Sequence, residues 1–445
     1  MMPHISDYEE ARTYLLGAVN ETVSRRVRGR LDRMRILLRR LGDPQTAYPT
    51  IQIGGTSGKG STASMVAAAL TASGKRTGLH VKPHINSMTE RAQIDGVNVA
   101  EARFAEVLDG MMAAIHETSE EIGDPSYYEI LLALAFSYFA QEHVDVGVIE
   151  VGLGGTLDGT NVLVPRLCVI TNVGLDHTDV LGETIEEIAG DKAGIAKVGI
   201  PLVSDAREPK ARETIARRCE EIGAPVIFVE DVATIESRSE QHSPNLFSVT
   251  TARATYHLAL PLLGSFQQRN AATAIVALEQ LGEDLRPRVV DVERGLSRLS
   301  IPGRMEYHPG YPGIVFDIAH NADKARGLAA ALTENFPEKR FMFVIAVSQG
   351  KDADNMLLPL LELPGSFVFT SFSAAGREAI RPQRLVNIAE LHGRTSRAIE
   401  DPIEAFAQVR RSTGDDAIVV VTGSTYVVSI LHEWWTDDQF TRSRR

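Results

Sequence analysis

The stretch TIQIGGTSGKGSTASMVAAAL, residues 50–70, decides the fold. It begins with a short β-type run, continues through a glycine-rich turn and ends in an alanine-rich segment that favours a helix. A glycine-rich turn between a buried strand and a helix points backbone N–H groups and the helix dipole at one place, which suits a phosphate. The common spelling of such a loop is Gly, four residues, Gly-Lys and then Ser or Thr. Here Ile53 occupies the first glycine position, and Gly60 separates Lys59 from Ser61.

We interpret this loop as a nucleotide site. Lys59 is long enough to reach the β- and γ-phosphates, and the Ser61 hydroxyl is a suitable oxygen ligand for Mg²⁺. The alternative is a glycine-rich turn between strand and helix that binds nothing. The residues assigned to the nucleotide here are Gly55, Thr56, Ser57, Gly58, Lys59, Gly60 and Ser61.

Composition limits the possible classes of protein. The chain has 445 residues and a formal net charge of −12, which argues against a protein that coats nucleic acid. Its two cysteines, Cys168 and Cys219, lie far apart without metal-ligand spacing, so we expect a reducing compartment and no disulfide framework. The amino terminus lacks the basic residues of a signal peptide, and the longest apolar run is too short to span a bilayer. We therefore expect a cytoplasmic protein that binds neither nucleic acid nor membranes.

The order of apolar runs predicts an α/β fold with two domains. Helical patterns over 8–19 and 30–41 come first, the second stopped by Gly42 and Pro44. Nearly continuous β-branched runs then alternate with helical patterns, as in parallel strands buried on both faces. The alternation starts afresh after the run LSIPGRME at 299–306. We predict a P-loop ATPase domain with a mostly parallel sheet over 1–298 and a Rossmann-like α/β domain over 299–445.

Several polar side chains follow predicted strands of the first domain. Glu150 ends an aliphatic run and precedes a glycine-rich turn, and His177 follows the next strand with Asp176 before it. Lys192 lies on the helix after that. Open parallel sheets bind ligands at the carboxyl ends of their strands, so these side chains are candidates for one site. Each also has a structural alternative: a carboxylate capped by backbone N–H groups, a satisfied polar histidine and a solvated lysine.

The second domain offers a similar group. Arg304 lies in the string IPGRMEYH, and Asp317 and His320 lie where a strand meets a helix in FDIAHNAD. Asn321 is a suitable N-cap for that helix. Either the segment is a capped helix with a chance histidine, or it faces the phosphate loop across a cleft.

Together these strings resemble the folylpolyglutamate synthase/dihydrofolate synthase family of the Mur ligase superfamily, whose members write their loop G-T-N-G-K-G-S. Shared order over nearly the whole chain carries the resemblance. The matching strings are GTSGKGS (55–61), KPHINSMTERAQIDG (82–96), EVGLGGTLDGTN (150–161), LDHTDVLGETIEEIAGDKAGIAK (175–197), GSFQQRNAATA (264–274), PGRME (302–306), DIAHNAD (317–323) and VVVTGSTYVV (419–428).

The resemblance implies roles for individual residues. The nucleotide would be held by the glycine loop with Asn270, Arg304 and Asp317. Two Mg²⁺ ions would be bound. Ser61 and Glu150 would bind the first ion, and Glu150, His177 and a carbamylated Lys192 the second. Carbamylation turns an ammonium group, which has no lone pair, into an oxygen ligand. Implied catalytic residues are Lys59, Lys192, Asp317 and His320, and implied acceptor-binding residues are Lys82, Pro83, His84 and Arg91.

The implied activity is ATP-dependent ligation of L-glutamate to a folate-type carboxylate through an acyl phosphate, by a monomer. Departures from the family spelling, chiefly Lys82, Thr156 and Phe266, leave the acceptor open. One alternative is a Mur-type ligase that joins an amino acid to a different carboxylate. A GTPase-like regulator would carry an Asn-Lys-x-Asp signature, which is absent, and a small-molecule kinase would leave the second domain unexplained.

Overall fold

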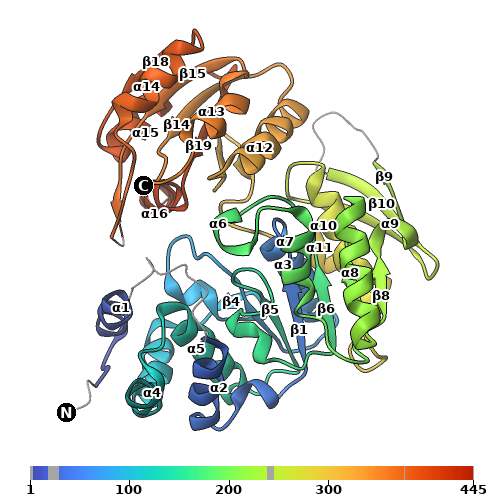
Figure 1. Ribbon diagram of the computed structural model, residues 1–445. Coiled ribbons are helices and arrows are strands. Elements are labelled where there is room, and N and C mark those ends of the chain that lie inside the picture. Colours follow the sequence, from blue (N-terminus) through green and yellow to red (C-terminus); the bar gives the residue numbers. More distant parts are fainter. Residues whose placement is uncertain (1–3, 19–29, 238–244, 375, 444–445) are drawn as a thin grey trace.

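The structure of the protein is a computed structural model that describes residues 4–18, 30–237, 245–374 and 376–443. Figure 1 shows a larger lower body, coloured blue to yellow, and a smaller orange-to-red upper body formed by the end of the chain. The boundary that the sequence predicts after residue 298 lies between helix α11 (Val289–Leu296) and strand β12 (Glu306–His308).

The larger body is built around an eight-stranded sheet with the order β4-β3-β2-β5-β1-β6-β7-β8. Neighbouring strands in the run β2-β5-β1-β6-β7-β8 are parallel. Strands β3 and β4 extend the β2 edge of the sheet and pair in antiparallel fashion. The strands are β1 (Thr50–Gly54), β2 (Thr77–His80), β3 (Gln93–Ile94), β4 (Val97–Asn98), β5 (Val146–Glu150), β6 (Leu167–Ile170), β7 (Leu202–Ser204) and β8 (Val226–Phe228).

The centre of this sheet explains the apolar runs in the sequence. Every residue of β1, β5 and β6 is buried, because helices cover both faces of the sheet. The parallel sheet and the mixed α/β class are therefore confirmed. The covering helices are α2 (Arg30–Arg40), α3 (Lys59–Ala72), α4 (Glu101–Ile122), α5 (Tyr127–Gln141), α7 (Ile185–Ala193), α8 (Pro209–Ile222) and α10 (Phe266–Glu279).

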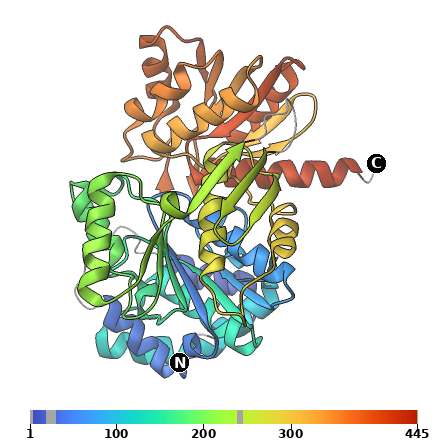
Figure 2. The same ribbon diagram turned by 90° about the vertical axis from the view of Figure 1, so that its right-hand side faces the viewer.

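Two further parts of the larger body flank this layer. Helix α1 (Tyr8–Gly17) packs on α4, and Val19, where the sequence predicts its end, lies outside the described residues. A small antiparallel sheet, which the sequence analysis does not anticipate, packs against α10 and α11 (Figure 2). Its strands are β9 (Ala233–Ser237), β10 (Asn245–Thr251) and β11 (Thr255–Leu260), in the order β11-β10-β9.

The smaller body contains a six-stranded sheet with the order β12-β13-β19-β14-β15-β18. All pairs are parallel except β12 with β13. Its elements, besides β12, are β13 (Gly313–Phe316), α12 (Ala322–Asn335), β14 (Arg340–Ile345), α13 (Ala353–Leu361), β15 (Gly365–Phe369), α14 (Pro382–Leu391), β18 (Ser396–Ala398), α15 (Pro402–Ser412), β19 (Ala417–Thr422) and α16 (Thr425–Ser443).

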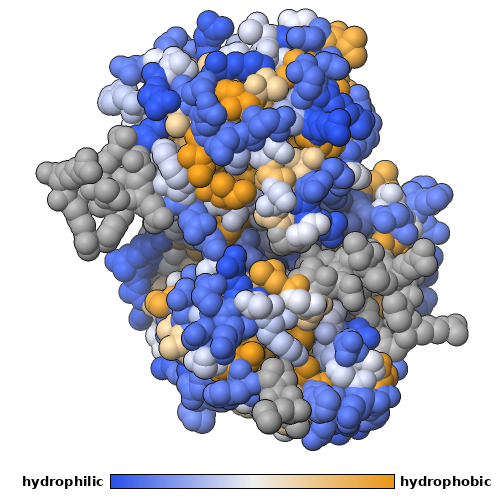
Figure 3. Space-filling model, turned by 90° about the vertical axis from the view of Figure 1, so that its left-hand side faces the viewer, coloured by the Kyte–Doolittle hydropathy of each residue, from blue (hydrophilic) through white to orange (hydrophobic). Residues whose placement is uncertain are grey.

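The remaining elements are short connections: η1 (Pro44–Thr46), η2 (Met88–Arg91), η3 (Gly159–Val162), α6 (Thr178–Leu181), α9 (Val229–Val232), β16 (Ser373–Ala374) and β17 (Arg377–Glu378). Hydrophilic residues cover most of the face shown in Figure 3, and hydrophobic residues lie on it in small groups. Within the described ranges, no helix is both long and apolar enough to cross a membrane.

Candidate active site

A cavity of about 670 Å³ lies where the two bodies face each other. It is lined by the glycine loop, by residues that follow β5 and β6, and by residues from the smaller body. Of the residues singled out in the sequence, its lining includes all seven of the glycine loop together with Lys82, Pro83, Glu150, His177, Lys192, Asn270, Arg304, Asp317 and His320. His84 and Arg91 are not among the lining residues; instead, Arg91 Nε donates to His84 Nδ1 at 3.0 Å.

The glycine loop has a conformation that other residues would not tolerate. Gly58 precedes α3 with a φ of 80°, and a Cβ there would collide with the Asn270 side chain. Gly55 has a φ of 138°, and a Cβ there would collide with the Thr171 hydroxyl. The backbone is therefore free to approach a phosphate closely at the amino terminus of α3.

Residues that follow β6 hold this loop in place. Thr171 Oγ1 donates to the Ser57 carbonyl at 2.6 Å, and the Ser57 N–H donates to Asn172 Oδ1 at 2.7 Å. The Thr56 hydroxyl contacts Gly174. The sequence analysis assigns no role to Thr171 or Asn172. The available signal was their place at the end of a strand that pairs with β1.

Two lysines converge on one carbonyl oxygen of the loop. Lys59 Nζ donates to Gly55 O at 2.9 Å, and Lys192 Nζ donates to the same oxygen at 3.0 Å. Burial lowers the pKa of Lys192 to about 8, and burial together with the charge of Lys82 lowers the pKa of Lys59. Both amines would gain from an anion in the cavity, and a phosphate chain supplies one.

The predicted metal ligands approach the loop from the sheet side. Glu150 is 2% exposed, and its Oε2 accepts the Lys82 N–H at 2.9 Å. A Cβ at Gly60 would lie 3.2 Å from Glu150 Oε2, which is a tight contact. Ser61 is buried in the first turn of α3. Burial also lowers the pKa of His177, which favours the neutral form of its imidazole. A carboxylate, a hydroxyl and a neutral imidazole beside a phosphate cradle fit a Mg²⁺-nucleotide complex.

The smaller body contributes a second set of groups. Asp317 Oδ2 and Oδ1 accept N–H bonds from Met305 at 2.9 Å and Ala319 at 2.8 Å, while burial raises the Asp317 pKa. His320 Nδ1 lies 2.9 Å from the Ile318 carbonyl, so this nitrogen carries the proton. Burial and the charge of Lys324 lower the His320 pKa to about 3, which leaves the ring neutral near neutral pH.

Lys324, which the sequence analysis does not single out, connects the two bodies. Its Nζ lies 3.0 Å from His320 Nε2 and 3.9 Å from Asp176 Oδ2 of the larger body. Burial lowers the Lys324 pKa to about 8. With Lys82 and Arg304, it places basic groups in a cavity whose lining also contains acidic residues such as Glu150 and Asp176. Basic groups in such a cavity can pair with an anionic substrate.

Comparison with known proteins gives consistent matches over nearly the whole chain. Residues 53–278 match the Mur ligase middle domain, and residues 307–433 match the C-terminal domain of dihydrofolate synthetase. The dihydrofolate synthase/folylpolyglutamate synthase of Bacillus subtilis is 32% identical over 431 residues, which cover 96% of this chain and 98% of that relative.

Solved structures agree with these matches. Escherichia coli FolC in complex with DHPP and ADP is similar with a TM-score of 0.86 and 25% identity, covering 98% of this chain and 100% of that one. The bifunctional folylpolyglutamate synthase/dihydrofolate synthase of Yersinia pestis, complexed with AMPPNP and a Mn ion, is similar with a TM-score of 0.83 and 25% identity, covering 98% and 100%.

Proposed function

Because this chain belongs to the dihydrofolate synthase/folylpolyglutamate synthase family of Mur ligases, we propose that it joins L-glutamate to a folate-type carboxylate with ATP as the second substrate. The observation that carries the proposal is one cavity between the two bodies, which is lined by both the glycine loop and the Asp317–His320 segment. Ligation needs the phosphate donor, the carboxylate and the amine side by side, and a cavity between two bodies can hold all three.

The chain's own residues have distinct roles in this reaction. A carboxylate oxygen of the acceptor attacks the γ-phosphorus, ADP leaves, and an acyl phosphate forms; the glutamate amine then attacks the acyl carbon, phosphate leaves and an amide remains. Lys59 and the backbone N–H groups of the loop stabilise negative charge on the transferring phosphoryl group. Closure of the two bodies around the cavity excludes water, which would otherwise hydrolyse the acyl phosphate.

The same geometry supports the nucleotide and metal assignments. We assign Asn270, Arg304 and Asp317 to the nucleotide, and Ser61, Glu150, His177 and a carbamylated Lys192 to two Mg²⁺ ions. Bound Mg²⁺ supplies Lewis-acid stabilisation of phosphoryl oxygens. The pKa of Lys192, about 8, supports the carbamate because the neutral amine is the form that reacts with CO₂.

We assign the acceptor to the segment that follows β2. Lys82 and Pro83, which line the cavity, are its expected contacts together with His84 and Arg91. A Mur-type ligase acting on a different carboxylate remains the second candidate, favoured by Lys82 in place of the family's serine.

We further propose two domains, 1–298 and 299–445, and a monomer, since one chain completes the cavity. The two cysteines, Cys168 and Cys219, are free and buried, and we infer a cytoplasmic location.

A ligase assay tests the proposal. The purified chain is incubated with Mg-ATP and L-glutamate, with dihydropteroate or tetrahydrofolate as the acceptor, and phosphate release and product mass are followed. We expect a product heavier than the acceptor by one glutamyl group, with one phosphate released per bond. Phosphate release without ligation to either acceptor would overturn the folate assignment.

A further inference from the structure

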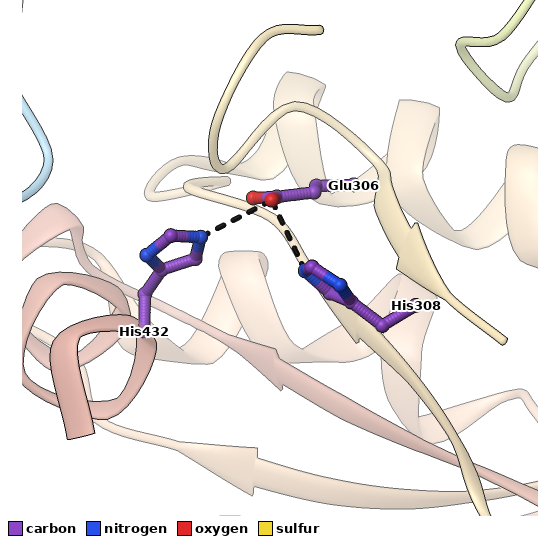
Figure 4. Close-up of side chains that lie close together, drawn as sticks. All are labelled: Glu306, His308 and His432. Carbon is purple, nitrogen blue, oxygen red and sulfur yellow. Dashed lines mark hydrogen bonds and ion pairs between the residues drawn. The ribbon is translucent and has the colours of Figure 1, made fainter. Parts of the chain in front are cut away.

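A second group of potential ligand side chains lies in the smaller body, and none of its members is among the residues that line the cavity. Glu306 and His308 lie two residues apart on β12 and therefore on one face of that strand, and His432 lies on α16. Glu306 Oε1 is 3.0 Å from His308 Nε2 and 3.1 Å from His432 Nε2. Figure 4 shows the carboxylate between the two rings. Among the described residues, these are the only three His, Cys, Asp or Glu side chains whose ligand atoms all lie within 4.8 Å of one another.

The donor set is typical of a transition metal. Two imidazole nitrogens and one carboxylate oxygen form the ligand set of many zinc sites, whereas Mg²⁺ is bound mainly by oxygen ligands. Ligand bonds of about 2.0–2.1 Å give neighbouring ligand atoms in a tetrahedron a separation of about 3.3 Å. The two oxygen–nitrogen distances of 3.0 and 3.1 Å are close to that value. The third distance, between the two imidazole nitrogens, is within 4.8 Å, so an ion would draw the two rings toward each other.

Asn86 can support the tautomer of His432 that a metal requires. His432 Nδ1 lies 3.1 Å from Asn86 Nδ2 and 3.2 Å from Asn86 Oδ1. Without a metal, the His432 Nε2–H donates to Glu306 and Nδ1 accepts from the amide nitrogen. With a metal, Nε2 offers its lone pair and the Nδ1–H donates to the amide oxygen, as the outer partner of a metal-bound imidazole does.

The surroundings hold the three side chains in place and keep one side open. The side chains of His432, Glu306 and His308 are 6%, 15% and 32% exposed, so His308 gives access from solvent. The Phe316 ring packs edge-on against His432 at 5.2 Å between centroids. Burial opposes ionisation of Glu306, but hydrogen bonds from His308 and His432 outweigh it and lower the Glu306 pKa to about 2.

We propose that Glu306, His308 and His432 form a binding site for a divalent transition-metal ion of the zinc type, with water as the fourth ligand.

The site also affects how the two bodies meet. Asn86 belongs to the 82–91 segment of the larger body, where Glu90 accepts three backbone N–H bonds, from Ile85, Asn86 and Ser87, at 2.6–2.8 Å. A bound ion fixes the Nδ1 proton of His432 and with it the contact to Asn86. The proposal does not depend on the ligase reaction.

Zinc binding to the full chain tests this proposal. The protein is stripped with a chelator, dialysed and titrated with Zn²⁺ in excess Mg²⁺, and bound zinc is measured by equilibrium dialysis. We expect one tight equivalent in the parent chain and an affinity at least tenfold lower in His308→Gln and His432→Gln. Two matched controls, His177→Gln at the cavity and His392→Gln on the exposed end of α14, should retain the equivalent. Asn86→Ala should weaken binding about tenfold through the outer contact.

A second measurement keeps the test valid if His432→Gln folds poorly. Zn²⁺ should raise the melting temperature of the parent and of His177→Gln but not of His308→Gln, because a ligand stabilises only the state that binds it. Equal zinc affinity in the parent and His308→Gln would overturn the site. So would the absence of bound zinc in the parent at tens of micromolar free Zn²⁺.

Discussion

Lys192 Nζ donates a hydrogen bond to the carbonyl oxygen of Gly55 at 3.0 Å, which joins helix α7 to the glycine loop after β1. Lys59 Nζ donates to the same oxygen at 2.9 Å. Nearby carboxylates attract both amines, Glu150 attracting Lys59 and Asp191 attracting Lys192, but burial outweighs this attraction and lowers both pKa values. Two ammonium groups on one carbonyl repel each other, and burial strengthens that repulsion. This repulsion disappears when the Lys192 amine is neutral. A carbamate on Lys192 replaces the repulsion with attraction, because its negative charge attracts the Lys59 ammonium.

Carbamylation of Lys192 should depend on pH in a defined direction. Only the neutral amine reacts with CO₂, and the Lys192 pKa of about 8 makes its neutral fraction rise between pH 7 and pH 9. We expect protein stripped of CO₂ to regain ligase activity after CO₂ is added. At constant dissolved CO₂, the initial rate of recovery should be about tenfold higher at pH 9 than at pH 7.

The comparison variants for this test are Lys192→Ala, which should stay inactive, and Lys210→Ala, which should behave like the parent. Lys210 is an exposed lysine on α8 that pairs with Glu186. A free ammonium at Lys192 in a crystal structure with Mg-ATP bound would contradict the carbamate.

Lys59→Ala should remove most of the ligase activity without unfolding the chain. Lys59 begins α3 at the phosphate cradle, and removal of one positive group near the transferring phosphoryl should raise the barrier by about 3 kcal/mol, or about 100-fold in kcat. Steady-state phosphate release measures kcat, and thermal melting checks the fold. Lys75→Ala, just beyond the other end of α3, is the matched control and should keep its rate. Turnover within threefold of the parent in Lys59→Ala would remove the loop from the mechanism.

The contact of Lys324 with Asp176 predicts a loss of activity in alkaline solution. Burial lowers the Lys324 pKa to about 8, so its charge and its attraction to Asp176 are lost as pH rises through 8. We expect kcat/KM to fall above that pH in the parent. In Lys324→Arg the fall should move to higher pH, because arginine stays charged.

Stability should respond to pH in the opposite direction at this residue. The folded pKa of Lys324 lies below the unfolded value of 10.5, so the unfolded chain binds more protons between pH 8 and 10.5. This group's contribution to the free energy of unfolding therefore rises with pH across that window. Denaturant melts at pH 8 and pH 10 measure this, and the free energy of unfolding should increase less between these pH values in Lys324→Arg than in the parent.

The kinetic prediction for Lys324 has its own contrary outcome. A fall in kcat/KM at the same pH in both proteins would assign the titration to another group.

Local patterns in the sequence account for the parts that could be predicted. The strand, loop and helix around Lys59 are encoded within 21 residues, so β1, the glycine loop and α3 follow from residues 50–70 alone. The small sheet β9–β11 was not predicted, although β10 and β11 are longer than the strands of the eight-stranded sheet; its place in the fold depends on packing against α10 and α11, which no local pattern shows. The approach of Lys324 to Asp176 depends on how the two bodies meet, and no local pattern encodes that. The hydrogen bond of Arg91 to His84 likewise could not be predicted from their spacing.

Lys82→Ser tests which anion this lysine serves. Lys82 follows β2 and lines the cavity, where burial lowers its pKa despite the nearby charges of Glu150 and Asp158. If its ammonium binds the acceptor, the hydrogen bond to a charged group contributes about 1.5–3 kcal/mol, and its loss should raise the acceptor's KM about tenfold or more. The KM for ATP should change little, and Lys82→Arg should keep most of the acceptor affinity.

If the ammonium instead neutralises Glu150, Lys82→Ser should leave the acceptor's KM unchanged. It should also lower the Mg²⁺ concentration needed for half-maximal activity, because the cation that competes with Mg²⁺ is gone. That second result would contradict the assignment of Lys82 to the acceptor.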